Sequence, residues 1–126
     1  TIRSAAPSGS LLFADLRMGH VLYYYLGRNE PNPANRSREG FRENVVGGYR
    51  LVRSPVWNFN AKRFGSEWRR LIDVYELAAG QTVWLVRVGS EYNPGAVLLQ
   101  IYSVTTLLRE FRFGEISVFE LRVPEQ

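Results

Sequence analysis

Apolar and polar residues alternate along this chain in short runs, and most of the apolar runs are rich in β-branched and aromatic side chains. Two such runs, at 71–77 and 82–88, are joined by the sequence AAGQ at 78–81. A glycine-containing loop of about four residues is a common hairpin connection. Both runs carry apolar side chains on both faces, which is typical of a strand covered on both sides. The pattern therefore predicts a central β-hairpin over 70–88.

The first half of that segment also fits an amphipathic helix. Five residues share the spacing of one helical face: Trp68, Leu71, Ile72, Tyr75 and Ala79. In that interpretation Ser66 is the N-cap and Gly80 is the glycine that follows the last turn. The weak helix propensity of Ile72, Val74 and Tyr75 favours the strand, and the helix remains the alternative.

The remaining runs predict a mainly β fold. Strands are expected at 11–17, 20–26, 45–53, 56–60, 96–104 and 116–123, while 105–113 fits a strand or a helix. Met18-Gly19 predicts a tight hairpin, and Gly47-Gly48 predicts a bulge or a close backbone approach. Short strands at this spacing predict a single-domain antiparallel β-sandwich, jelly-roll-like or barrel-like, with at most one or two short helices.

Polar segments divide the chain further. Residues 1–10 contain Pro7 and Gly9 among small side chains and predict a flexible arm ahead of one β domain at 11–126. Residues 27–44 contain two prolines and four asparagines and predict a long polar loop, and 61–69 is basic and loop-like. Such a long loop is either a solvated surface or a recognition element.

Composition excludes several kinds of site. The chain has no cysteine and a single histidine, His20, so disulfides, thiolate metal sites and sites with two imidazoles are excluded. Nothing in the sequence predicts a metal or a cofactor. The net charge is +4, and Lys62 is the only lysine among basic residues that are otherwise arginine. Such a mild positive field favours acidic partners without requiring nucleic acid. No apolar run approaches the length of a membrane-spanning helix.

One enzyme alternative comes from a resemblance. An aromatic run ending near Arg28, the sequence REGF at 38–41 and acids near the C-terminus are similar to the layout of ADP-ribosyltransferase domains. The resemblance implies an enzyme in which an Arg and a late Glu act on NAD. The Ser-Thr-Ser middle motif and the late E-x-E or Q-x-E motif of that family are absent here.

The strongest functional signal is the sequence RSPVWNFNAKRFGSEWRR at 53–70, which interleaves aromatic and basic residues. The candidate binding residues are Trp57, Phe59, Lys62, Arg63, Trp68 and Arg69. Exposed aromatics beside arginines suit a protein interface, and they also suit single-stranded nucleic acid or an anionic glycan. If the aromatics are buried instead, the basic side chains merely cover the core.

The sequence therefore predicts a non-enzymatic structural or interaction module that packs into a homo-oligomer or a larger assembly. A binding domain for nucleic acid or an anionic glycan is the alternative.

Overall fold

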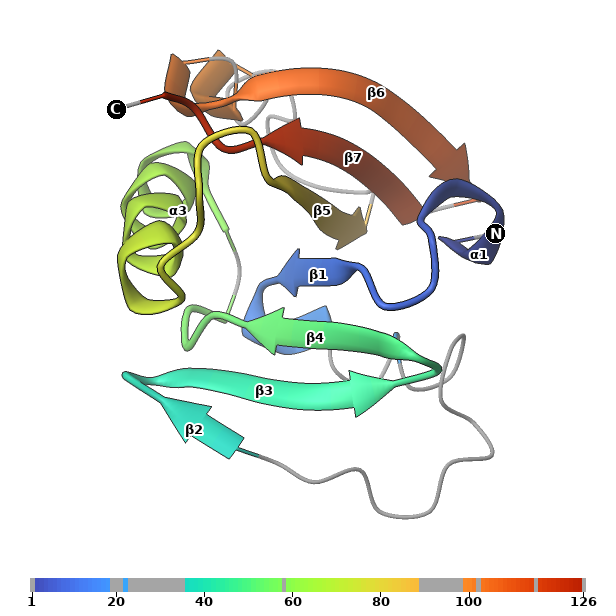
Figure 1. The fold of residues 1–126 in the computed structure, drawn as a ribbon, viewed down its shortest axis with the longest axis horizontal. Coiled ribbons are helices and arrows are strands. Elements are labelled where there is room, and N and C mark those ends of the chain that lie inside the picture. Colours follow the sequence, from blue (N-terminus) through green and yellow to red (C-terminus); the bar gives the residue numbers. More distant parts are fainter. Residues whose placement is uncertain are drawn as a thin grey trace.

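The computed structural model describes residues 2–18, 22, 36–57, 59–88, 99–101, 103–114 and 116–125. Its seven strands are β1 (Leu11–Ala14), β2 (Arg36–Arg38), β3 (Phe41–Val46), β4 (Tyr49–Arg53), β5 (Thr82–Val88), β6 (Thr106–Phe113) and β7 (Ile116–Arg122). They form one sheet in the order β2-β3-β4-β1-β5-β7-β6, so β2 and β6 are its two edges (Figure 1).

The sheet is mixed. Strand β1 lies parallel to both β4 and β5, and the other neighbouring pairs are antiparallel. The mainly β class is confirmed. The expected antiparallel sandwich is not confirmed, because the described strands form one open sheet rather than two packed sheets or a closed barrel. Strands β4 and β5 run in the same direction, so the chain between them must cross over, and a helix makes that crossing.

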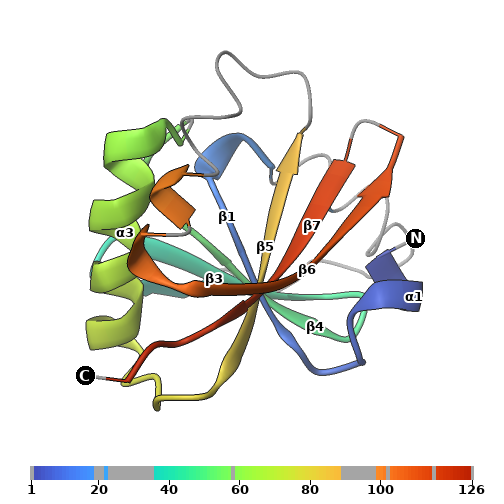
Figure 2. The same cartoon turned by 90° about the horizontal axis from the view of Figure 1, so that it is seen from above.

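This helix is α3 (Ala61–Val74), which lies over one face of the sheet (Figure 2). The predicted strand at 71–77 and the predicted loop at 61–69 are therefore wrong, and the helical alternative is correct for this segment. Phe64, Trp68 and Leu71 recur at helical spacing and are fully buried. Burial of this stripe against the sheet outweighs the weak helix propensity of the β-branched residues.

Both ends of α3 differ from the helix expected from the sequence. Asn60, not Ser66, is the N-cap, and its side chain accepts a hydrogen bond from the Arg63 N–H over 2.9 Å. At the other end the N–H of Leu77 donates to the Ile72 carbonyl over 3.0 Å. This is the Schellman arrangement, and Glu76 occupies the left-handed position with a φ of 50°.

Gly80, which the sequence placed after the helix, lies instead in the turn before β5. Its N–H donates to the Val123 carbonyl over 2.9 Å, and its φ is 86°. The turn therefore ties the start of β5 to the end of β7.

The sheet separates two hydrophobic clusters because successive strand residues face opposite sides. Phe13 and Leu85 pack on the α3 side, whereas Leu12 and Trp84 pack on the other side. The second cluster is completed by the short N-terminal helix α1 (Ile2–Ala5), visible on the opposite face from α3 in Figure 2.

Residues 2–10 are part of the fold, contrary to the flexible arm expected at 1–10. Ile2 and Ala6 are buried in the second cluster. The Tyr49 hydroxyl donates to the Ala6 carbonyl over 2.7 Å, and the Arg50 N–H donates to the Ser10 carbonyl over 3.1 Å. Ile2 and Ala6 are four residues apart, so a single turn of helix brings both side chains against the sheet.

The predicted polar loop at 27–44 contains strands in its second half. Strands β2 and β3 form a hairpin whose turn is Glu39-Gly40, with φ angles of 49° and 88°. Gly47-Gly48 is likewise the two-residue turn between β3 and β4, with φ angles of 57° and 85°, rather than a bulge within one strand. Positive φ at both central positions is typical of the type I′ turn, which suits the twist of paired strands.

Several other strand predictions change. The neighbours of β1 in the sheet are β4 and β5, one on each side, so they occupy the positions where the predicted hairpin through Met18-Gly19 would place its second strand. The chain turns instead into a short 3-10 helix, η1 (Leu16–Met18), and most of 20–26 lies outside the described residues. The described residues of 56–60 are not strand, and those of 96–104 are helical. Segment 105–113 becomes β6, and the predicted strands at 82–88 and 116–123 are confirmed as β5 and β7.

Candidate functional site

Two charged residues at the carboxyl ends of parallel strands bracket the backbone of Phe59. Asp15 directly follows β1, and Arg87 lies near the end of β5. The Phe59 N–H donates to Asp15 Oδ2 over 3.2 Å, and the Phe59 carbonyl accepts from Arg87 Nη2 over 3.0 Å. With its ring buried against Phe13 and Phe64, Phe59 is held by both its backbone and its side chain.

The Asp15 carboxyl is buried, with 1% of its surface exposed. Burial raises the pKa of Asp15, and the hydrogen bond from Phe59 and the charge of Arg17 offset this only in part. Arg17 Nε donates to the same Oδ2 over 3.2 Å, while Oδ1 accepts no hydrogen bond from the described residues. Desolvation disfavours the carboxylate more than these two partners favour it.

The segment before Phe59 is also fixed. The Leu16 N–H donates to the Val56 carbonyl over 2.9 Å, and the Arg17 N–H donates to the Trp57 carbonyl over 3.2 Å. Trp57 is nevertheless 66% exposed. A large aromatic side chain is thus presented to solvent from a backbone that is bonded into the end of the sheet.

Trp57 borders an open groove of about 720 Å³ at the start of α3. The groove is lined by Glu39, Pro55, Val56, Trp57, Asn60, Arg63, Glu67 and Arg70. Several of its lining side chains are joined by polar contacts. Arg70 Nη2 donates to Glu67 Oε2 over 2.9 Å, and the Ser54 hydroxyl donates to the same oxygen over 2.6 Å. The Arg70 guanidinium also lies 4.1 Å from the centre of the Phe41 ring and bonds the Glu39 carbonyl.

The charged side chains at the two ends of α3 have the signs that interact unfavourably with the helix dipole. Lys62 and Arg63 lie in the first turn, where the helix already carries partial positive charge, and no acidic residue is present there. The acidic side chain of Asp73 lies in the last turn, which lacks a basic residue. This placement costs stability, typically 0.3–1 kcal/mol for a surface charge, and it concentrates positive potential beside Trp57. Departures from local stability rules of this kind are expected at functional surfaces.

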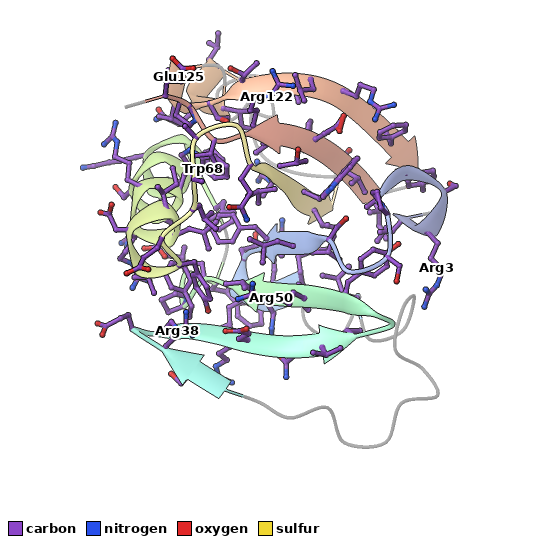
Figure 3. The ribbon with its side chains drawn as sticks, in the orientation of Figure 1. Arg3, Arg38, Arg50, Trp68, Arg122 and Glu125 are labelled. Carbon is purple, nitrogen blue, oxygen red and sulfur yellow. The ribbon has the colours of Figure 1, made fainter. Side chains whose placement is uncertain are left out.

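The structure separates the six candidate residues into two groups. Trp57, Lys62, Arg63 and Arg69 are exposed, whereas Phe59 and Trp68 are buried in the α3-side cluster. Figure 3 shows Trp68 between α3 and the strands. Phe59 and Trp68 therefore stabilise the fold and do not present a ring to an external partner.

Only some of the exposed candidates lie together. Trp57 and Arg63 share the groove, and Lys62 is the exposed residue before Arg63 in the first turn of α3. Arg69 instead lines a separate hollow of about 410 Å³ with Ser103 and Pro124. We therefore define the Trp57 surface as Trp57, Lys62 and Arg63 together with the groove beside them.

Sequence reasoning missed the groove residues Asn60, Glu67 and Arg70. The Glu67–Arg70 pair has helical i,i+3 spacing, so the helical alternative contained its signal. That alternative began at Ser66 and therefore gave Asn60 no role. Glu39 was unpredictable because it reaches the groove only through the β2–β3 turn.

The described residues contain no cluster of three His, Cys, Asp or Glu side chains able to hold a metal ion. None of the helices they form is long and apolar enough to cross a membrane. For the ADP-ribosyltransferase alternative, Arg28 lies outside the described residues, and 38–41 spans the turn between β2 and β3.

Comparisons with protein-family models, with curated proteins and with solved structures find no match to this chain.

Proposed function

We propose that this chain is a non-enzymatic interaction module that binds a protein partner through the Trp57 surface. The observation that carries the proposal is the presentation of Trp57, whose ring is exposed while the backbone on both sides of it is hydrogen-bonded. Tryptophan and arginine dominate the binding energy of protein interfaces, and a rigid anchor loses little conformational entropy on binding.

The partner chemistry follows from the charges around the ring. Lys62, Arg63 and the start of α3 all contribute positive potential. The side chains of Glu67 and Arg70 bond one another and carry little net charge together. A matching partner presents an apolar contact for Trp57 and acidic groups for the two cations. A second copy of this chain and a different chain in a larger assembly both fall within the proposal.

A protein partner is favoured over single-stranded nucleic acid because the stretch 53–70 exposes one aromatic ring. Phe59, Phe64 and Trp68 are core residues, so successive bases have no ladder of rings on which to stack. Sequence-independent binding of single strands uses several such rings along a basic groove.

Site-specific photo-crosslinking tests the proposal. The chain is produced in its native cells with a photoreactive phenylalanine derivative in place of Trp57. The matched control carries the same derivative in place of Val45, which is 58% exposed on β3. We expect a discrete protein adduct from position 57 alone, and loss of that adduct when Arg63→Glu is added. Equal labelling from positions 57 and 45, or an adduct indifferent to Arg63→Glu, contradicts the proposal.

An anionic glycan is a second candidate, supported by the polar lining of the groove and the cations of the first turn of α3. Titration with heparin, with polyuridylate as the nucleic-acid comparison, measures this binding through Trp57 fluorescence. Counterion release predicts an affinity that falls linearly with salt on logarithmic axes. Arg63→Glu abolishes such binding and Arg69→Glu leaves it nearly unchanged, since Arg69 lines another hollow. Absence of heparin binding at low salt removes this candidate.

A further inference from the structure

The eight-residue strand β6 forms one edge of the sheet. Among the described strands it pairs with β7 alone, so the backbone groups on its other side have no strand partner (Figure 1). The opposite edge, β2, has three residues. A long free edge is a template for pairing with another strand, whereas a very short edge is protected.

One face of β6 carries two half-exposed aromatic rings. Phe111 and Phe113 stack with their centres 6.4 Å apart and an interplanar angle of 3°, and Phe111 lies 6.2 Å from Trp84. Their partners on β7 are Val118 and Ile116, which belong to the α1-side cluster. The hydrophobic layer therefore continues to the last strand of the sheet and ends there with rings partly open to solvent.

The other face of β6 carries a loosely paired set of charges. Glu110 and Arg112 are exposed, and their charged groups are 3.9 Å apart, at the limit of an ion pair. Arg109, by contrast, is already engaged, since its Nε donates to Glu120 on β7 over 2.7 Å. Glu110 and Arg112 are therefore the charges available for a contact across the edge.

We propose that β6 pairs antiparallel with β6 of a second copy, about a two-fold axis that passes midway between the two copies of Phe111. In an antiparallel pair the opposite residues share a face, so a two-fold axis perpendicular to the sheet pairs positions of equal parity. Centring on Phe111 sets Phe111 against its own copy and Glu110 against Arg112 of the second copy, twice by symmetry.

Three neighbouring registers oppose like charges. Centring on Arg109, Glu110 or Arg112 places that charge directly against itself, which destabilises a cross-strand pair. The Phe111 register also sets Arg109 opposite Phe113 of the second copy, where a guanidinium can contact a ring. Strand β6 is thus charge-complementary to itself in one register.

The register has a natural limit. Pairing with β7 shifts between Leu107 and Arg109, an irregularity that bends the strand. The regular part of the edge is therefore 109–113, five residues on each chain. So short a contact buries less than the roughly 1,200–2,000 Å² of a stable interface, and we expect a weak, concentration-dependent dimer.

Charge reversal tests this pairing on the whole chain. Sedimentation equilibrium over increasing protein concentration measures the dimerisation constant of wild type and variants. Glu110→Arg alone and Arg112→Glu alone each convert two attractive contacts into two repulsive ones, and we expect dimerisation to weaken about tenfold. The double variant Glu110→Arg/Arg112→Glu restores the wild-type constant. Both side chains are exposed, and circular dichroism verifies that each variant is folded.

A mixture of the two single variants provides a second measurement. In the Phe111 register each chain of the mixture supplies the charges that the other needs, so we expect a heterodimer stronger than either variant's homodimer. A wild type that stays monomeric at every concentration overturns the proposal. So does a dimer whose constant is unchanged by the single reversals, or a mixture that gains nothing.

Trp57 separates this inference from the proposed function. Trp57→Ala removes the anchor of the Trp57 surface and lies outside β6, so the β6 dimer keeps its wild-type constant. Loss of the dimer in Trp57→Ala shows that self-association uses the Trp57 surface instead, and overturns the β6 pairing.

Discussion

The N–H of Phe59 donates a hydrogen bond to the carboxyl of Asp15 over 3.2 Å, although 44 positions separate the two residues in the chain. Asp15 directly follows the first strand and Phe59 leads into α3, so this bond joins the sheet to the helix that covers it. The same bond fixes the segment that presents Trp57.

Asp15 makes stability depend on pH. Burial raises its pKa above the ordinary value of 3.8, so the folded state holds this proton more tightly than the unfolded state does. The stabilising contribution is complete below pH 3.8 and is lost as the pH rises through the raised folded pKa. As the pH rises over that interval, we expect Asp15→Asn to become more stable relative to wild type. Above the interval, the difference in unfolding free energy between the two proteins is constant. Urea denaturation of both proteins at several pH values measures the difference, and a pH-independent difference contradicts the assignment.

The N-cap of α3 is a second prediction. Asn60→Ala removes the acceptor of the Arg63 N–H, and we expect a loss of about 1 kcal/mol in unfolding free energy. Ser66→Ala is the matched control, because the Ser66 hydroxyl bonds the Lys62 carbonyl within the helix and alanine suits a helix interior. Denaturation curves that rank Ser66→Ala as the more damaging change contradict Asn60 as the cap.

The C-terminal end of α3 predicts a stabilising substitution. Glu76 has a φ of 50°, a conformation that disfavours residues other than glycine, asparagine and aspartate. Glu76→Gly relieves this strain, and we expect a gain of about 0.5–1 kcal/mol. Gly80→Ala provides the opposite change, since its φ is 86° and its surroundings leave space for a methyl group, so only backbone strain is added. A lower melting temperature for Glu76→Gly than for wild type contradicts this prediction.

Trp57 and Trp68 differ in their roles. Trp68 is fully buried against Phe64 and Phe13, and Trp68→Ala should cost about 3–5 kcal/mol of stability. Trp57→Ala should change stability by less than about 0.5 kcal/mol, since its ring lies mainly in solvent. Acrylamide quenching distinguishes them independently, because Trp57→Phe removes the readily quenched fluorescence and Trp68→Phe does not. Equal destabilisation by the two alanine variants contradicts the burial described here.

The mainly β class and the positions of β5 and β7 were predictable from the sequence. Thr82–Val88 is apolar on both faces, and its described side chains from Val83 to Arg87 are buried on both. Ile116–Arg122 is buried on both faces over its first four residues and ends with Arg122 exposed. The local pattern is sufficient here because a strand covered on both faces needs apolar side chains on both, whichever strands are its neighbours.

The segment that became α3 shows where local pattern fails. Trp68, Leu71 and Ile72 satisfy a helical stripe and also fit a strand that is apolar on both faces. The parallel direction of β4 and β5, with β1 between them, requires a crossover and selects the helix. That direction is a relation between strands distant in the chain, which a window of neighbouring residues does not contain.

The candidate site likewise combines features that the sequence shows with features that depend on the fold. The amino-acid sequence alone shows that aromatic and basic residues alternate at 53–70, and that the chain offers no thiolate or paired-imidazole chemistry. Only the folded chain shows that Phe59 lies in the core while Trp57 is exposed. Asp15 and Arg87 hold the Phe59 backbone against the sheet and leave the Trp57 ring in solvent. Composition fixes which side chains are present, but contacts between residues far apart in the chain determine which of them a partner can reach.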